Sequence, residues 1–178
     1  KQREAEVRFL RAHFYFKLLS MYRQIPWIDE KVYEDKTTES TSNTQFTYEE
    51  LWQKVIADFQ TAYDVLPAKQ KDGGRVNKIA AAGYLAKCYL TIAWGDGYEA
   101  TDGVDHINKE YMQKVVEYTD VVKNSDYGYM ADFGDIFLPD NKNSKESVFA
   151  VQASDYSEDH TTFGRGNWSN VLNGCWGM

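Results

Sequence analysis

The sequence predicts a mostly α-helical protein built from antiparallel helix pairs, with little strand and a loop-rich final region. Three observations carry this prediction. Four stretches place apolar residues at helical spacing, and capping residues, proline or glycine mark several of their boundaries. The later residues lose this spacing and are rich in Asp, Ser, Thr, Gly and Asn. We therefore expect one partial domain over 1–178, with a helical scaffold at 1–124 and a loop-rich segment at 125–178 that holds a short strand near 147–152.

The first expected helix runs from about Arg3 to Tyr22, before Pro26. At about 100° per residue its apolar side chains fall on two nearly opposite stripes. A surface helix needs only one such stripe, so this pattern predicts a helix packed between neighbours on both sides, as in a stacked helical array. Phe9 and Phe14 should then both be buried. The two stripes are Ala5, Phe9, Ala12, Phe16 and Leu19, and Val7, Leu10, Phe14, Leu18 and Met21.

The second expected helix has a clear start. In "FTYEEL", Thr47 is the N-cap and Glu50 stands three residues later, which is the pattern of a capping box. Phe46 and Leu51 form the flanking hydrophobic pair. The helix should end before Pro67, and its inward stripe is Leu51, Val55, Phe59, Ala62 and Leu66.

The third expected helix, "KIAAAGYLAKCYLTIAW", follows Asn77 as N-cap and is apolar nearly all round, so it should be buried. Its small residues allow neighbouring helices to approach closely, which favours a tetratricopeptide-like array, although the repeat consensus is not matched. Cys88 should behave as a small core residue. The fourth expected helix covers about Lys109 to Lys123.

The three tryptophans within 1–124 divide into two groups. Trp52 and Trp94 lie on helical faces and are expected in the core, whereas Trp27 beside Pro26 is open to either reading.

Composition restricts the function. The net charge of −7 argues against a nucleic-acid partner, since binding phosphates needs clustered Lys and Arg. No apolar run is long enough for a membrane-spanning helix, and the two cysteines have no metal or redox spacing. The chain starts without Met and ends in loop composition, so we expect it to be part of a longer protein.

Five blocks occur in an order typical of one family. Together they resemble the SusD/RagB family of surface lipoproteins over about Ala5 to Gln152. A departure is Arg23, where the family often has glycine just after the first helix, so the turn should be built differently. The blocks are "AEVRFLRAHFYFKLLSMYRQIPWI", "YEELWQKVIADFQTAYDVLP", "GRVNKIAAAGYLAKCYLTIA", "SDYGYMADFGDIF" and "ESVFAVQ".

The resemblance implies a mostly helical protein in which tetratricopeptide-like helix pairs support a loop-rich ligand face. It implies no enzyme activity. Members are lipid-anchored on the extracellular face of the outer membrane, through an N-terminal region not in this chain. They cap a SusC-like TonB-dependent transporter and capture glycans, less often peptides, for import. The first helix would pack between helices on both sides, one of them outside this chain.

Glycan capture has a recognisable chemistry, because the C–H face of a sugar packs on aromatic rings while its hydroxyls need amides and charged groups. The region after Gln152 offers this mixture, although its aromatics could equally pin a long loop to the helices. Trp168 and Trp176 are the leading ligand-binding candidates. The candidate set is completed by Tyr156, Arg165 and Asn167.

The sequence has a few other features that bear on its chemistry. No cofactor is expected; the acidic loop "GDGYEATDGVD" has oxygen ligands that suit structural calcium, but solvated loop acids are commoner. His13, His106 and His160 are scattered, with His13 expected to be paired or solvated along a seam of the first helix. Three alternatives stay open: a tetratricopeptide-type peptide-binding scaffold, a peptide rather than glycan importer subunit, and a glycoside-cleaving enzyme. The enzyme would need paired carboxylates, for which the late loops offer Asp155, Glu158 and Asp159.

Overall fold

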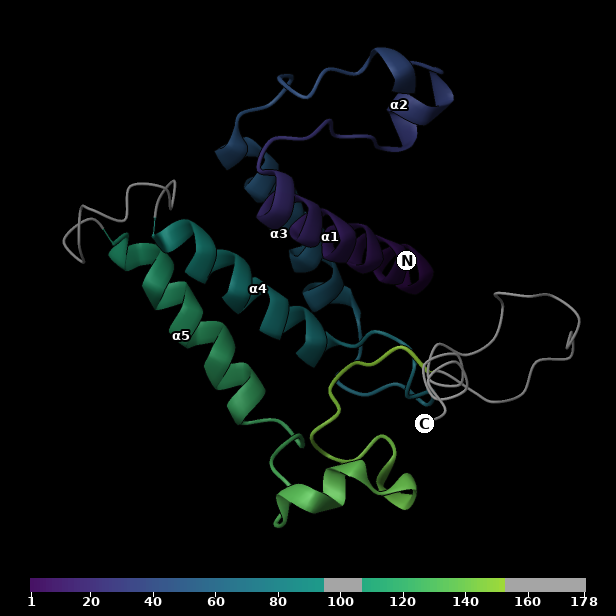
Figure 1. The fold of residues 1–178 in the computed structure, drawn as a ribbon, viewed down its shortest axis with the longest axis vertical. Helices are drawn as coiled ribbons and strands as arrows, with labels where there is room; N and C mark the ends of the chain where they lie inside the picture. Colours follow the sequence, from purple (N-terminus) through teal and green to yellow (C-terminus); the bar gives the residue numbers. More distant parts are fainter. Residues whose placement is uncertain (95–106, 153–178) are drawn as a thin grey trace, which may run out of the picture.

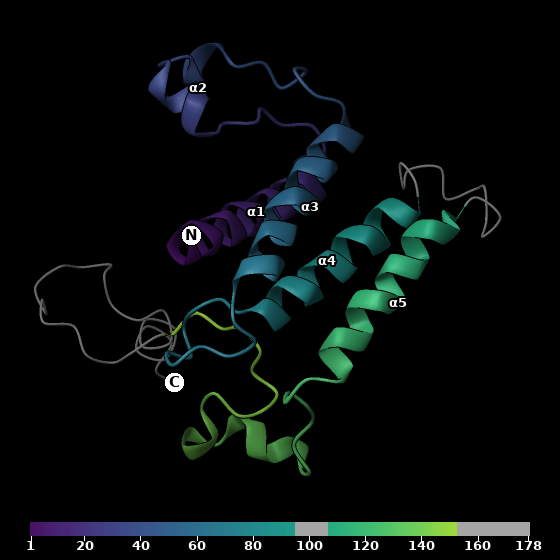
Figure 2. The ribbon, with the colours of Figure 1, turned by 180° about the vertical axis from the view of Figure 1, so that it is seen from behind.

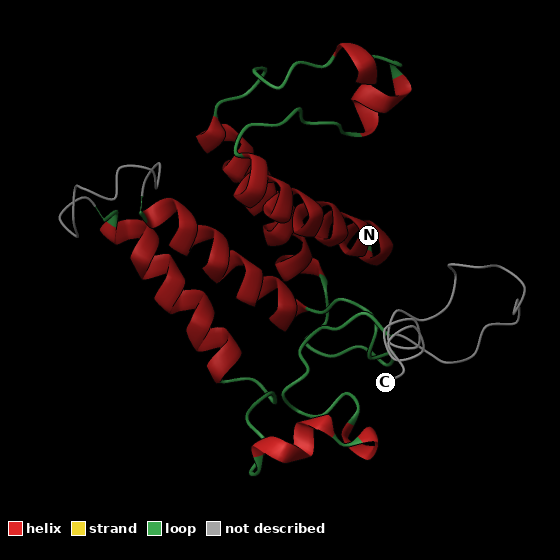
Figure 3. Ribbon diagram, viewed as in Figure 1, coloured by secondary structure: helices red, strands yellow, loops and turns green. Residues whose placement is uncertain are grey.

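The structure is a computed structural model that describes residues 1–94 and 107–152. These residues form a helical protein, and no strand occurs among them (Figure 3). Short 3-10 helices also lie in the loops, at Thr38–Ser40, Phe133–Phe137 and Pro139–Asn141. The α-helices are α1 at Gln2–Tyr22, α2 at Glu30–Glu34, α3 at Tyr48–Val65, α4 at Lys78–Ala93 and α5 at Lys109–Lys123.

The four long helices pack in chain order. α1 lies along α3, α3 along α4, and α4 along α5, as both views show (Figures 1 and 2). The predicted helix-pair architecture is therefore confirmed. Short α2 projects away from the pairs on the loop between α1 and α3, and was not anticipated from the sequence.

One stripe of α1 faces the core and the other faces outward. Phe9 is fully buried, and its ring meets those of Phe59, Tyr84 and Phe149 edge-on. Phe14, on the second stripe, is 61% exposed. The expected burial on both sides is thus met for Phe9 and not for Phe14 in this chain. The other members of the exposed stripe are Val7, Leu10, Leu18 and Met21.

The boundaries of α3 and α4 confirm the capping predictions. The Glu50 N–H donates to Thr47 Oγ1 at 3.2 Å while the Thr47 N–H donates to Glu50 Oε2 at 2.7 Å, so the capping box is complete. Asn77 caps α4 by accepting from the Ala80 N–H at 2.9 Å. Both helices then bury their apolar residues in one core, including Trp52 and Cys88.

A buried ion pair joins α1 to α3. Arg11 donates to both oxygens of Asp58, at 2.6 and 2.8 Å, and reaches Glu30 of α2 at 2.9 Å. The Asp58 side chain is almost wholly buried, and its two hydrogen bonds with Arg11 offset the free-energy cost of burying its charge. The bond to Asp58 raises the pKa of Arg11 further, which keeps the guanidinium charged.

The chain leaves α1 through a tight turn at Arg23, confirming that this turn is made without glycine. Arg23 has φ 64° and ψ −70°, and the Gln24 N–H donates to the Tyr22 carbonyl at 2.8 Å. This is a classic γ-turn, a rare and strained conformation for a residue with a side chain.

Two sequence-based expectations are corrected and a third is met in part. The strand expected near 147–152 is loop, because the described residues offer it no partner strand. Trp94, at the end of α4, is 51% exposed rather than in the core. His13 is half-buried: its Nδ1 has no hydrogen-bond partner in the described part of the chain and its ring packs against Tyr84, so the expected pairing is not seen there while part of the side chain keeps contact with solvent. Trp27, left open by the sequence, is buried.

No helix within 1–94 or 107–152 combines the length and apolarity needed to cross a bilayer.

Candidate functional site

The residues predicted to bind ligand lie outside the described residues. The same holds for the acidic loop considered for calcium and for His106 and His160. These assignments stay predictions. The undescribed candidates are Tyr156, Arg165, Asn167, Trp168 and Trp176, with Asp96, Glu99, Asp102 and Asp105 in the acidic loop.

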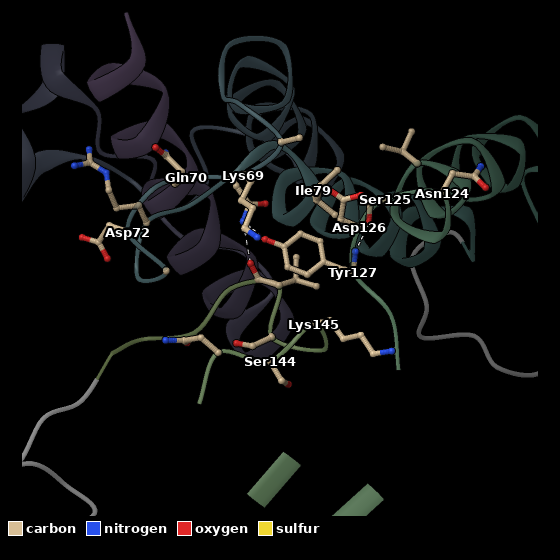
Figure 4. A pocket seen from close by; sticks show the side chains of 18 residues that line it. Lys69, Gln70, Asp72, Ile79, Asn124, Ser125, Asp126, Tyr127, Ser144 and Lys145 are labelled. Atoms are coloured by element: carbon tan, nitrogen blue, oxygen red, sulfur yellow. Dashed lines mark hydrogen bonds between the residues drawn. The ribbon is translucent and has the colours of Figure 1, made fainter. Parts of the chain in front are cut away.

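The described residues enclose a polar hollow of about 480 Å³ at the end of the helix pairs. Three segments far apart in sequence line it: the loop before α4, the chain that leaves α5, and the stretch 143–148. Figure 4 shows the ring of Tyr127 central among the side chains that line this hollow, above Ser144 and Lys145 in that view. The volume falls within the range of small-molecule sites, about 300–1,000 Å³.

Asn77 ties the three segments together. Its Oδ1 caps α4, and its Nδ2 donates to Tyr127 Oη at 3.0 Å and to the Val148 carbonyl at 2.9 Å. The side chain is buried and all its bonds are made within the protein. Asn77 therefore acts as a structural anchor of the hollow, and the three segments around it are held in fixed relative positions.

The wall formed by the loop before α4 is held to α1. Gln70 donates to the Val76 carbonyl at 2.7 Å and to Glu6 Oε1 at 3.0 Å, and Arg75 forms an ion pair with Glu6. Burial alone would raise the pKa of Glu6, but the hydrogen bonds from Arg75 and Gln70 and the charge of Arg75 outweigh it and lower that pKa. Glu6 is thus a charged anchor for this loop.

Two paired amides lie against the tip of the same loop. Asn143 Nδ2 donates to Gln152 Oε1 at 2.8 Å, and Gln152 Nε2 donates back to Asn143 Oδ1 at 2.9 Å. Gly74 lies under this pair, where an added Cβ would come within 2.8 Å of the Gln152 side chain. The close approach of the two loops at this rim therefore favours glycine at position 74.

An apolar groove of about 670 Å³ lies on the other side of Tyr127, between α4 and α5. Tyr127, Lys145 and Val148 line both spaces, so the tyrosine stands between a polar and an apolar surface. The groove is otherwise lined largely by small and aliphatic side chains, among them Gly83, Ala86, Leu90, Val115 and Val122.

The remaining reactive side chains do not form a reaction centre in the described residues. No group of three or more His, Cys, Asp or Glu residues placed to hold a metal ion occurs within 1–94 and 107–152. Burial raises the pKa of the Cys88 thiol, which leaves it protonated and unreactive. Burial, together with the charges of Lys17 and Lys87, lowers the pKa of His13 and favours its neutral form.

Sequence reasoning did not single out the residues of this hollow as a site. Asn77 was recognised only as a helix cap, and Tyr127 only as part of a family block. The available signal was the polar run "NSDY" directly after the last long helix, in which Asn124, Ser125, Asp126 and Tyr127 all line the hollow.

Comparison with known proteins identifies the family. Residues 1–90 match the SusD-like family described as starch-binding and associating with the outer membrane. A SusD-like protein of Bacteroides ovatus is 31% identical over 149 residues, or 83% of this chain. The chain belongs to the SusD-like family.

Solved structures of similar fold agree with this membership. A protein crystallised with a xylogluco-oligosaccharide is 28% identical, with a TM-score of 0.66 over 86% of this chain and 30% of that one. Surface glycan-binding protein A of Bacteroides thetaiotaomicron, solved with laminarihexaose, is 21% identical, with a TM-score of 0.62 over 85% of this chain and 28% of that one, and supports the fold alone. The SusD-like chain spans about a quarter of the length of its Bacteroides ovatus relative, 26%.

Proposed function

We propose that this SusD-like protein captures a glycan at the cell surface and delivers it to a SusC-like TonB-dependent transporter of the outer membrane. The observation that carries the proposal is family membership, together with a relative of the same fold that was crystallised with a xylogluco-oligosaccharide. Lipid anchoring on the extracellular face, through a region outside this chain, belongs to the same proposal. No nucleic acid takes part.

The mechanism is capture without chemistry. Aromatic rings pack on the C–H faces of sugar residues while amides and charged side chains meet the hydroxyls, so the glycan is held without breaking a bond. In this account Trp168 and Trp176 supply the rings, and Tyr156, Arg165 and Asn167 supply polar contacts. The protein acts as a binding subunit and the transporter performs the import.

Binding by the full-length protein tests the proposal. Calorimetric titration with maltohexaose, laminarihexaose, a xylogluco-oligosaccharide and an oligogalacturonide should give saturable binding to at least one, and titration with a mixed peptide pool should give none. Binding of peptides alone would contradict glycan capture and favour the peptide-importer alternative. Co-purification of the full-length protein with a TonB-dependent transporter from outer membranes tests the partner.

Two tryptophan variants test the binding residues. Trp168→Ala and Trp176→Ala should each weaken glycan binding by roughly 1–3 kcal/mol, by analogy with loss of a buried apolar contact. Thermal melts should stay close to wild type, because a loop residue supports little of the core. Unchanged affinity in both variants, or lost affinity accompanied by a much lower melting temperature, would make these residues loop anchors.

A further inference from the structure

We propose that the polar hollow around Tyr127 is a sugar-binding subsite of the helical scaffold, taking one neutral, hydroxyl-rich sugar residue. The inference rests on the proposed function, and it adds a contact point separate from the loop tryptophans. It is carried by three features of the hollow: walls that are already fixed, side chains that are still free to bond, and a lining of mixed charge.

The walls are fixed before any ligand arrives. Several polar side chains of the lining and rim are already hydrogen-bonded or ion-paired within the protein. They are Asn77, Gln70 and Arg75, together with Asn143 and Gln152 at the rim. Ser125 is committed in the same way, donating to the Val122 carbonyl at 2.6 Å and accepting from the Tyr127 N–H. A ligand entering this space does not have to order the segments around it, which lowers the entropic cost of binding.

A second set of lining side chains has hydrogen-bonding groups that no other described residue uses. Four of the side chains that line the hollow make no hydrogen bond or ion pair with another residue of the described part. They are those of Lys69, Asn124, Asp126 and Lys145. The Tyr127 hydroxyl accepts from Asn77, and its own proton has no acceptor among the described residues. The free groups therefore include cationic donors, a carboxylate that only accepts, an amide that does both, and a phenol donor.

This mixture selects the ligand class. A sugar hydroxyl both donates and accepts, so neighbouring hydroxyls on one ring are able to satisfy Asp126 and an ammonium group together. An anionic ligand would suit Lys69 and Lys145 but would face the acceptor-only carboxylates of Asp126 and Asp72. The apolar part of the lining, including Ile79, Val121 and Val148, gives the C–H face of the ring a surface to pack against.

Tyr127 explains how such a subsite is oriented. Its hydroxyl is held by buried Asn77, so the ring stands in one position between the polar hollow and the apolar groove. A sugar residue lying beside it would contact a fixed phenol on one side and the free polar groups on the other. The site therefore has the arrangement of fixed apolar surface and convergent polar groups that small-molecule sites require.

The test compares a double variant of the full-length protein with a matched control. Asn124→Ala/Asp126→Ala removes two free groups that support no other described contact, so the fold should be retained. Asp120→Ala removes an exposed carboxylate from α5 that does not line the hollow. Calorimetric titration uses the neutral oligosaccharides maltohexaose, laminarihexaose and xylogluco-oligosaccharide. We expect the double variant to bind about tenfold more weakly, the effect of one or two lost hydrogen bonds, and Asp120→Ala to match wild type.

Hydrogen exchange supplies the local readout. With a neutral oligosaccharide bound, peptides covering 68–77 and 143–148 should exchange more slowly in wild type and not in the double variant. Wild-type affinity in the double variant, without protection of these peptides, would overturn the subsite and leave the proposed function standing. Protection by the oligogalacturonide alone would overturn the neutral ligand class. Absence of glycan binding by the wild type would overturn the proposed function and this inference with it.

Discussion

Arg23 makes the turn that ends α1 at a conformational cost. Its φ of 64° and ψ of −70° place it in a classic γ-turn, where a Cβ is strained and glycine is not. Its guanidinium lies 5.1 Å from the centroid of the Tyr48 ring, at the first turn of α3. The side chain therefore contributes a contact across the α1–α3 pair while the backbone beneath it is strained.

Comparing two substitutions separates these effects. Arg23→Gly and Arg23→Ala both lose the contact with Tyr48, but only glycine relieves the backbone. We expect the Gly variant to be more stable than the Ala variant by about 1 kcal/mol, after allowing for the greater flexibility of glycine in the unfolded chain. Urea unfolding measures the difference. The same pair at Lys17, exposed within α1, should show the opposite order. Equal stability of the two Arg23 variants would show that the turn is unstrained.

Glu6 provides a pH-dependent anchor. Its pKa is held below the ordinary value of 4.5 despite its burial, because Arg75 and Gln70 hydrogen-bond its charged form. The unfolded chain therefore binds this proton more readily than the folded chain. The stability that Glu6 contributes is present above its unfolded pKa and is lost as the pH falls through its folded pKa.

Acid titration of stability checks this anchor. Between about pH 6 and about pH 3, the melting temperature of wild type should fall more steeply than that of Glu6→Gln, which cannot ionise at this position. Glu49→Gln, on the exposed first turn of α3, is the control and should follow wild type. Parallel curves for wild type and Glu6→Gln would mean that Glu6 does not link acid to unfolding.

At the scale of the elements, Asn77 joins three segments through one side chain. It caps α4, holds the Tyr127 hydroxyl and pairs with the Val148 carbonyl. Removing it should free the start of α4, the chain after α5 and the 143–148 stretch together. These segments are the walls of the polar hollow, so the helix cap and the site share one support.

Two substitutions at Asn77 divide this role. Asn77→Ala should lower the free energy of unfolding by about 3 kcal/mol. This sums about 1 kcal/mol for the lost helix cap and about 1 kcal/mol for each of the two other lost hydrogen bonds. Asn77→Ser retains a cap oxygen and should cost about 1 kcal/mol less. Denaturant unfolding gives both values. A cost below about 1 kcal/mol for Asn77→Ala would indicate that the bonds to Tyr127 and Val148 contribute little to stability.

The sequence predicted the elements that local chemistry determines and missed those that depend on tertiary partners. Thr47 and Asn77 set their helix starts through bonds three residues away, so their caps could be read directly. The "SVFAVQ" stretch is a short apolar run with the composition of a strand, but the Val148 carbonyl accepts from Asn77 and Phe149 packs on Phe9. The hollow escaped prediction because its lining comes from segments that no single motif connects.

At the scale of the whole molecule, α1 has one apolar face buried and one exposed. Phe9 meets three aromatic rings in the core, whereas Phe14 and the rest of its stripe face outward. Folded proteins rarely expose an apolar stripe along an entire helix to solvent. The chain spans 26% of its Bacteroides ovatus relative, and the two apolar stripes of the helix predict packing neighbours on both sides.

We therefore expect Phe14 to be buried in the full-length protein. There, Phe14→Ala should destabilise by about 3–5 kcal/mol, as Phe9→Ala should, since each removes a core ring. Tyr33→Ala, on exposed α2, is the control and should change stability by less than about 0.5 kcal/mol. Chemical unfolding of the full-length variants distinguishes the outcomes. If Phe14→Ala behaves like the Tyr33 control, the second stripe is solvent-facing and α1 forms an outer helix of the array. If it behaves like Phe9→Ala, both stripes are packing surfaces, which is what their spacing on one helix predicts.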